Sequence, residues 1–103
     1  RPIMGSIAEK FSDYIFLTSD NSRTENQNDI LNDILKGIKN RNKIDVDIDR
    51  YSAIKKAINL GKSNDIVLIA GKGHENYQIL KNKTIDFDDK VIASDLLIEK
   101  LNL

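Results

Sequence analysis

The sequence contains no cysteine, no tryptophan and a single proline among its 103 residues. Without cysteine there is no disulfide framework, no zinc site built from thiolates and no cysteine nucleophile, and this composition fits the reducing cytoplasm. An excess of one charge is missing as well, because sixteen Lys and Arg side chains balance sixteen Asp and Glu. A chain without a basic excess is not expected to bind nucleic acid or anionic membranes in general.

Long apolar runs are also absent, and no stretch approaches the ~20 apolar residues that cross a bilayer. Apolar residues still make up 40% of the chain, which is enough to form one core. The length matches a single domain, so we expect one domain over residues 1–103. Because the chain begins with Arg1 and its only methionine is Met4, we expect it to be a piece of a longer protein.

Apolar spacing predicts helices that alternate with strands along most of the chain. The expected helices cover residues 2–12, 28–38, 53–60 and 88–101, and the expected strands cover 14–18, 44–48 and 66–70, with a hairpin over 77–86. Residues 66–70 are apolar without alternation, which is typical of a central parallel strand covered on both faces. The fold class is therefore expected to be α/β, a three-layer sandwich with a mainly parallel sheet and one antiparallel edge strand or hairpin.

Polar functional groups concentrate in two loops, each directly after an expected parallel strand. Residues 19–24 follow the strand at 14–18, and residues 71–75 follow the strand at 66–70. In an open parallel sheet, ligands bind beyond the carboxyl ends of the strands. We therefore expect the binding site at these two loops, which would open on the same edge of the sheet.

The first loop carries Asp20, Asn21 and Arg23 within four residues. A carboxylate can accept an ammonium group and a guanidinium can bind a carboxylate with two hydrogen bonds, so together they suit a zwitterion. The alternative is that Asp20 and Asn21 only close a turn or cap the next helix, while Arg23 lies in solvent. By residue type alone this alternative is the better supported one, because Asp and Asn are common turn residues.

The second loop reads Gly71-Lys72-Gly73-His74-Glu75. Its glycines would let a ligand approach the backbone. The alternative is a flexible turn with a solvated histidine, and residue spacing favours neither interpretation. A dinucleotide fingerprint is excluded because Asn76 stands where the third glycine is needed. No metal site is expected, since the single histidine has no second histidine nearby.

Five stretches of this sequence resemble the C-terminal domain of the Mur ligase family. They are RPIMG at 1–5, TSDNSR at 18–23, Asp49-Arg50 with Ala53-Ile54, VLIAGKGHENYQ at 67–78 and FDD at 87–89. Their order and spacing match the family, and the AGKGHE-x-YQ pattern is the most specific. Within the family, the chain is most similar to the ligases that add a diamino acid to UDP-N-acetylmuramoyl-L-alanyl-D-glutamate.

The resemblance implies a Rossmann-like domain of a cytoplasmic, monomeric ligase of bacterial peptidoglycan synthesis. In that family ATP phosphorylates the substrate carboxylate, and the incoming amine attacks the acyl phosphate. The family has three domains, and this chain resembles the third. Because this chain has no Walker loop, the resemblance implies that ATP and Mg²⁺ are bound mainly upstream. It also implies that no catalytic residue lies in this fragment and that the isolated domain is inactive.

Carried over position by position, the resemblance implies five residues that bind the incoming diamino acid: Asp20, Asn21, Arg23, Gly71 and Glu75. Arg23 would bind the distal carboxylate of meso-diaminopimelate, and the two carboxylates would face its distal ammonium. Relatives that add diaminopimelate commonly read DNPR, whereas this chain has Ser22 in place of the proline. A lysine- or ornithine-adding ligase is therefore an alternative, and a freestanding Rossmann-like module for a small molecule or nucleotide is the second hypothesis.

Overall fold

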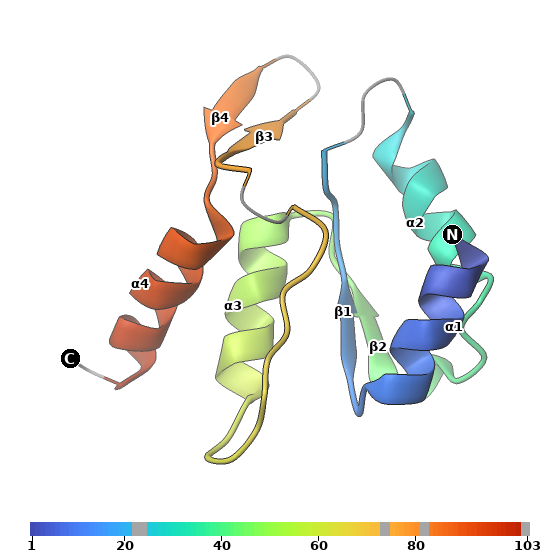
Figure 1. Ribbon diagram of the computed structural model, residues 1–103, viewed down its shortest axis with the longest axis horizontal. Helices are drawn as coiled ribbons and strands as arrows, with labels where there is room; N and C mark the ends of the chain where they lie inside the picture. Colours follow the sequence, from blue (N-terminus) through green and yellow to red (C-terminus); the bar gives the residue numbers. More distant parts are fainter. Residues whose placement is uncertain (22–24, 73–74, 81–82, 102–103) are drawn as a thin grey trace. The chain divides into compact units, whose positions relative to one another are not determined.

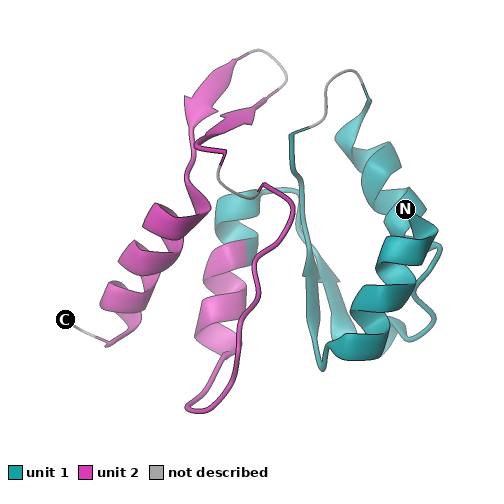
Figure 2. Cartoon of the chain, in the orientation of Figure 1, with its two compact units in different colours: residues 1–53 teal, residues 54–103 magenta. Residues whose placement is uncertain are grey.

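The structure is a computed structural model that describes residues 1–21, 25–72, 75–80 and 83–101. This part of the chain is a mixed α/β structure with four α-helices, a parallel pair of strands and an antiparallel hairpin (Figure 1). The chain divides into two compact units, residues 1–53 and residues 54–103 (Figure 2). Among the described helices, none is both long and apolar enough to cross a membrane.

The first unit contains α1 (Pro2–Phe11), β1 (Ile15–Leu17), α2 (Gln27–Leu35), a 3₁₀ turn (Arg41–Lys43) and β2 (Ile44–Val46). Pro2 begins α1, because the fixed φ angle of proline suits a first helical turn. Asn26 caps α2 with a side-chain oxygen that accepts from the backbone N–H of Asn28. The strands β1 and β2 pair in parallel, with Ile15 opposite Ile44, which confirms two of the expected strands.

Two glycines lie where α1 comes close to α2 and to the turn that follows it: Gly5 within α1 and Gly37 just after the end of α2. A Cβ atom on Gly5 would collide with the carbonyl oxygen of Ile34, and one on Gly37 would collide with the carbonyl oxygen of Pro2. Glycine is therefore required at both positions for the backbones to come this close. The end of α1 is closed by Lys43, whose Nζ donates to the carbonyl oxygens of Glu9 and Ser12 over 2.8 and 3.0 Å.

The second unit contains most of α3 (Arg50–Leu60), then β3 (Tyr77–Ile79), β4 (Thr84–Asp86) and α4 (Asp89–Leu101). The strands β3 and β4 form the expected hairpin, with Gln78 opposite Ile85. The core of this unit consists of Ile54, Ile58, Phe87 and Leu96. Lys100 closes the end of α3, because its Nζ donates to the carbonyl oxygens of Ile58, over 2.6 Å, and Gly61.

The expected central strand at residues 66–70 is not a strand in the structure. Ile66 is 93% exposed and Leu68 is 85% exposed, whereas Ile69 packs against the core of the second unit. An apolar run identifies residues that favour extended backbone, but a strand also needs a neighbour whose backbone groups pair with its own. Each sheet of the described chain holds two strands, so the predicted mainly parallel sheet is present here only as the β1–β2 pair.

Candidate functional site

The first loop leaves the end of β1 and holds Asp20 and Asn21, both half-buried. The backbone N–H of Asn21 donates to Oδ1 of Asp20 over 2.7 Å, and Nε2 of Gln27 donates to the carbonyl oxygen of Asp20. The second of these bonds links the loop to Gln27, the first residue of α2.

A buried arginine fixes the backbone in front of this loop. The Nη1 atom of Arg50, at the start of α3, donates to the carbonyl oxygen of Ser19 over 3.0 Å. Arg50 is 3% exposed and Ser19 is buried with it. The carboxylate of Asp49 accepts from the backbone N–H of Ser52, so the Asp49-Arg50 pair both caps α3 and holds the loop before Asp20.

The second loop begins at Gly71, whose φ angle is 113°. A residue with a Cβ atom is strained at this positive φ angle, so the backbone conformation at position 71 requires glycine. Lys72 follows and is 3% exposed. The backbone N–H of Glu75 donates to the carbonyl oxygen of Lys72 over 3.1 Å, and the Tyr77 hydroxyl donates to Oε2 of Glu75 over 3.3 Å.

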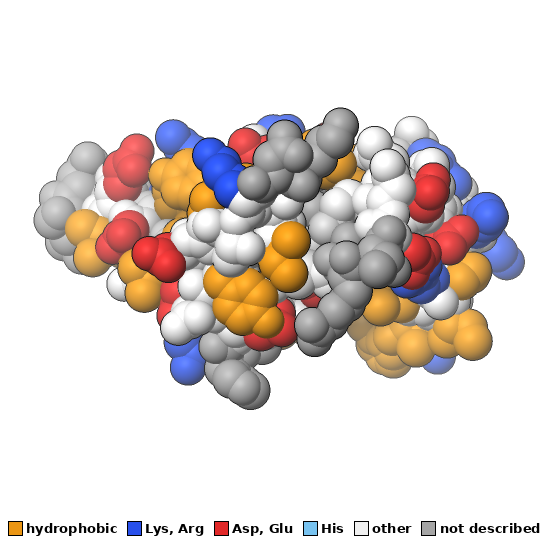
Figure 3. All heavy atoms as spheres, turned by 90° about the horizontal axis from the view of Figure 1, so that it is seen from above, with side chains coloured by type: hydrophobic (Ala, Val, Ile, Leu, Met, Phe, Trp, Pro, Cys, Tyr) orange, Lys and Arg blue, Asp and Glu red, His pale blue; other side chains and the backbone are white. Residues whose placement is uncertain are grey.

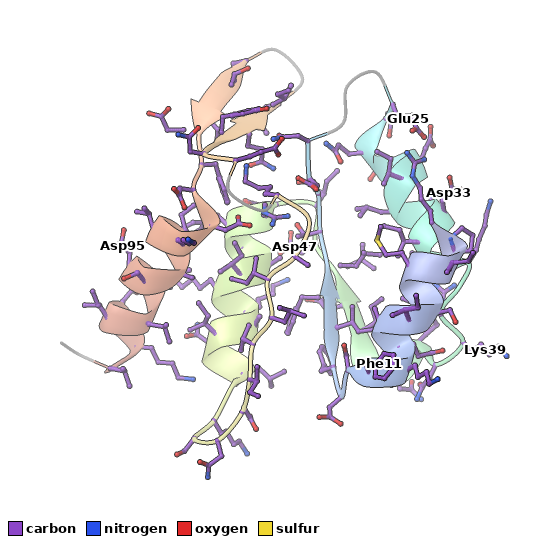
Figure 4. All side chains as sticks on the ribbon, viewed as in Figure 1. Phe11, Glu25, Asp33, Lys39, Asp47 and Asp95 are labelled. Carbon is purple, nitrogen blue, oxygen red and sulfur yellow. The ribbon has the colours of Figure 1, made fainter. Side chains whose placement is uncertain are left out.

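An exposed ion-pair cluster lies between the start of α1 and α2. The guanidinium of Arg1 donates to the carboxylate of Glu25, and its Nη1 lies 3.5 Å from Oδ2 of Asp33. Figure 4 labels Glu25 and Asp33. The hydrogen bond from Arg1 lowers the pKa of Glu25, whereas the pKa of Asp33 is lowered first by its hydrogen bond from Lys36 and then by Arg1. The same contact with Glu25 raises the pKa of Arg1.

Figure 3 shows both Lys and Arg side chains and Asp and Glu side chains among the described residues on the face that it draws. This distribution agrees with the balanced composition. Among the described residues, no group of three or more His, Asp and Glu side chains could hold a metal ion.

The structure describes four of the five predicted site residues. Asp20 and Asn21 are bonded to each other in the first unit, and Gly71 and Glu75 lie in the second. Arg23, Ser22, Gly73 and His74 lie outside the described residues. The meeting of the two loops therefore stays a prediction. The buried side chains of Arg50 and Lys72 support these loops and were not predicted from the sequence, although both residues stand inside the motifs that carry the family resemblance.

A family model described as Mur ligase, glutamate ligase domain matches residues 1–73, well over half of the chain. The chain belongs to the Mur ligase family. Three relatives similar to this Mur ligase chain are each named a UDP-N-acetylmuramoyl-L-alanyl-D-glutamate–2,6-diaminopimelate ligase.

The relative from Prochlorococcus marinus subsp. pastoris is 61% identical over 100 residues, which cover 97% of this chain and 20% of the relative. The one from Clostridium acetobutylicum, numbered ligase 1, is 52% identical over 99 residues, or 96% of this chain and 20% of its own length. The one from Aquifex aeolicus is 48% identical over 97 residues, or 94% of this chain and 20% of its own length. This Mur ligase chain thus spans about one fifth of the length of the curated relatives it matches.

Proposed function

We propose that this chain is the C-terminal domain of a MurE-type ligase, which uses ATP to join meso-diaminopimelate to UDP-N-acetylmuramoyl-L-alanyl-D-glutamate. The observation that carries this proposal is the 61% identity, over nearly the whole chain, to a relative named for that reaction. The complete enzyme would be a cytoplasmic monomer of bacterial peptidoglycan synthesis. Membership of the Mur ligases favours this function over a freestanding binding module.

Within that ligase, the two loops of this domain bind the incoming diamino acid. Arg23 takes the distal carboxylate with paired hydrogen bonds, and the carboxylates of Asp20 and Glu75 take the distal ammonium. Asn21 and the carbonyl oxygen of Gly71 complete the polar contacts. The geometry of the described residues supports these roles, because the hydrogen bond from Asn21 reaches only Oδ1 of Asp20 and the Tyr77 hydroxyl holds one oxygen of Glu75.

ATP and Mg²⁺ are assigned mainly to the part of the ligase outside this chain. The sequence holds no Walker loop, and the described residues offer no acidic or histidine cluster that fits a metal ion. The contribution of this domain is to bind and orient the diamino acid, so that its proximal amine is free to attack the acyl phosphate. Orientation of this kind lowers the entropic part of the barrier without a catalytic side chain.

We further propose that the domain has the three-layer, Rossmann-like fold that its family implies. The alternation of helices with strands along the described chain supports this fold class.

The function is tested by ADP release from the full-length ligase in the presence of UDP-N-acetylmuramoyl-L-alanyl-D-glutamate. We expect turnover with meso-diaminopimelate and little with lysine or ornithine. The Arg23→Ala variant is expected to lose most of its turnover of meso-diaminopimelate, because the partner of the distal carboxylate is gone. Lys39→Ala is the matched control, since Lys39 is an exposed cation in the first unit (Figure 4). Preferred turnover of lysine or ornithine would change the substrate, and no turnover with any diamino acid would overturn the function.

A further inference from the structure

Lys72 is buried, although an ammonium group is rarely buried without partners. Its Nζ donates to the carbonyl oxygen of Tyr77. The same atom lies 5.5 Å from the centre of the Tyr77 ring and 5.7 Å from the centre of the Phe87 ring, which places it at cation–π distance from both. The ammonium group is therefore held by a carbonyl oxygen and two aromatic rings, all in the second unit.

Hydrogen bonds also hold the backbone at Glu75 and at the residues that follow it. The side chain of Lys72 reaches forward to the carbonyl group of Tyr77, and its own carbonyl oxygen accepts the backbone N–H of Glu75 over 3.1 Å. The next residue, Asn76, accepts from the backbone N–H of Phe87 over 3.0 Å, and Phe87 belongs to the core. The backbone of Glu75 is thus bonded to Lys72, and the two residues after it are bonded to Phe87 and Lys72.

The carboxylate of Glu75 is held by the same group of residues. The Tyr77 hydroxyl donates to Oε2 of Glu75 over 3.3 Å, and the ring of Tyr77 is one of the two aromatic contacts of Lys72. Removal of the ammonium group would release the Tyr77 carbonyl and the ring contact together. The Glu75 carboxylate would then lose a fixed partner and gain side-chain freedom, which a ligand must remove on binding.

We propose that Lys72 is a positioning residue for the diamino acid, which acts by holding the Tyr77 hydroxyl and the Glu75 carboxylate in the geometry that receives an ammonium group. This inference rests on the proposed function, in which Glu75 binds the distal ammonium of the substrate. Lys72 itself does not touch the substrate in this arrangement, because its ammonium group is buried against Tyr77 and Phe87.

The test compares steady-state constants of the full-length ligase and four variants. Lys72→Met keeps an unbranched side chain one atom shorter and removes the ammonium group, and Lys72→Arg keeps a cation near the rings. Tyr77→Phe keeps the ring and removes only the hydroxyl bond to Glu75. Lys83→Met is the matched control, because Lys83 is an exposed lysine of the same unit.

For Lys72→Met we expect KM for meso-diaminopimelate to rise about tenfold, with KM for ATP and for the UDP-linked dipeptide within about twofold of wild type. Lys72→Arg is expected to recover most of this loss, Tyr77→Phe to raise the same KM about threefold, and Lys83→Met to leave it unchanged. A general loss of structure would instead affect all three substrates.

An unchanged KM for the diamino acid in a folded Lys72→Met variant, beside an active wild type, would overturn the role of Lys72 and leave the proposed function standing. If circular dichroism shows that Lys72→Met is unfolded, Tyr77→Phe decides, and its unchanged KM would overturn the role. A wild-type ligase that uses no diamino acid would overturn the proposed function, and the role of Lys72 with it.

Discussion

The guanidinium of Arg50 donates a hydrogen bond of 3.0 Å to the carbonyl oxygen of Ser19, and both residues are buried. This bond ties the first turn of α3 to the residue directly before Asp20. Because Asp20 and Asn21 are proposed to bind the diamino acid, the position of these groups depends on a residue 31 positions away in the sequence.

We predict that Arg50→Lys in the full-length ligase raises KM for meso-diaminopimelate about fivefold or more and leaves KM for ATP unchanged. Lysine keeps the charge but lacks the planar fork that reaches a carbonyl oxygen in fixed geometry. Arg41→Lys is the control, because the Arg41 guanidinium also donates to backbone carbonyls, those of Leu35 and Ile38, but is exposed. Equal effects of the two substitutions on KM would contradict a role for Arg50 in the loop.

Gly71→Ala is expected to lower the free energy of unfolding by about 1–2 kcal/mol, since a Cβ atom is strained at its φ angle of 113°. Gly61→Ala provides a comparison in the same unit. A Cβ atom there would make ordinary contacts at 3.5–3.6 Å, so we expect little loss of stability. Urea denaturation of both variants measures the difference, and equal losses would contradict a strain specific to Gly71.

Lys100→Met is expected to lower the free energy of unfolding by about 1 kcal/mol, because the last carbonyl groups of α3 lose a charged donor. Lys90→Met, at an exposed lysine of the same helix α4, is expected to change it by only a few tenths of a kcal/mol. The two urea midpoints give the comparison. Equal midpoints would show that the contact of Lys100 with α3 adds no stability.

The pKa values of Glu25 and Asp33 are lowered in the folded chain, so their contribution to stability is present at neutral pH and above their ordinary pKa values near 4. It declines as the pH falls through the lowered pKa values, where both carboxylates become protonated. We expect Arg1→Met to reduce stability slightly at pH 7 and not at pH 2, because exposed ion pairs are weak and screened by salt. Urea midpoints at the two pH values test this, and an equal loss at both would assign the effect to packing.

Local patterns predicted most of the secondary structure. The helices α1 to α4 and the strands β1 and β2 follow from apolar spacing, and the hairpin follows from two short runs around a polar turn. Residues 66–70 have the same kind of pattern but form no strand here, because backbone pairing depends on a second segment that periodicity does not identify.

The candidate site residues differ in how they were predicted. Asp20 was proposed from its chemistry in a polar loop, whereas Glu75 was implied by the family resemblance, and both roles stay predictions. The burial of Arg50 and Lys72 was not predicted, since it depends on carbonyl groups and rings contributed by other segments. Lys and Arg side chains are usually solvated, and the residues adjacent to them in the sequence do not indicate when one is buried.

The RPIMG stretch is one of the motifs that resemble the family, and its final glycine, Gly5, allows close helix packing. A side chain on Gly5 would strike the backbone of Ile34, so this letter of the motif sets the distance between two helices. Gly37, in the turn after α2, sets a second close approach, to the carbonyl oxygen of Pro2 in α1. A motif typical of a ligase family can therefore include residues whose role is to set the distance between backbone segments. Replacement of such a glycine would displace α1 whether or not a ligand is bound.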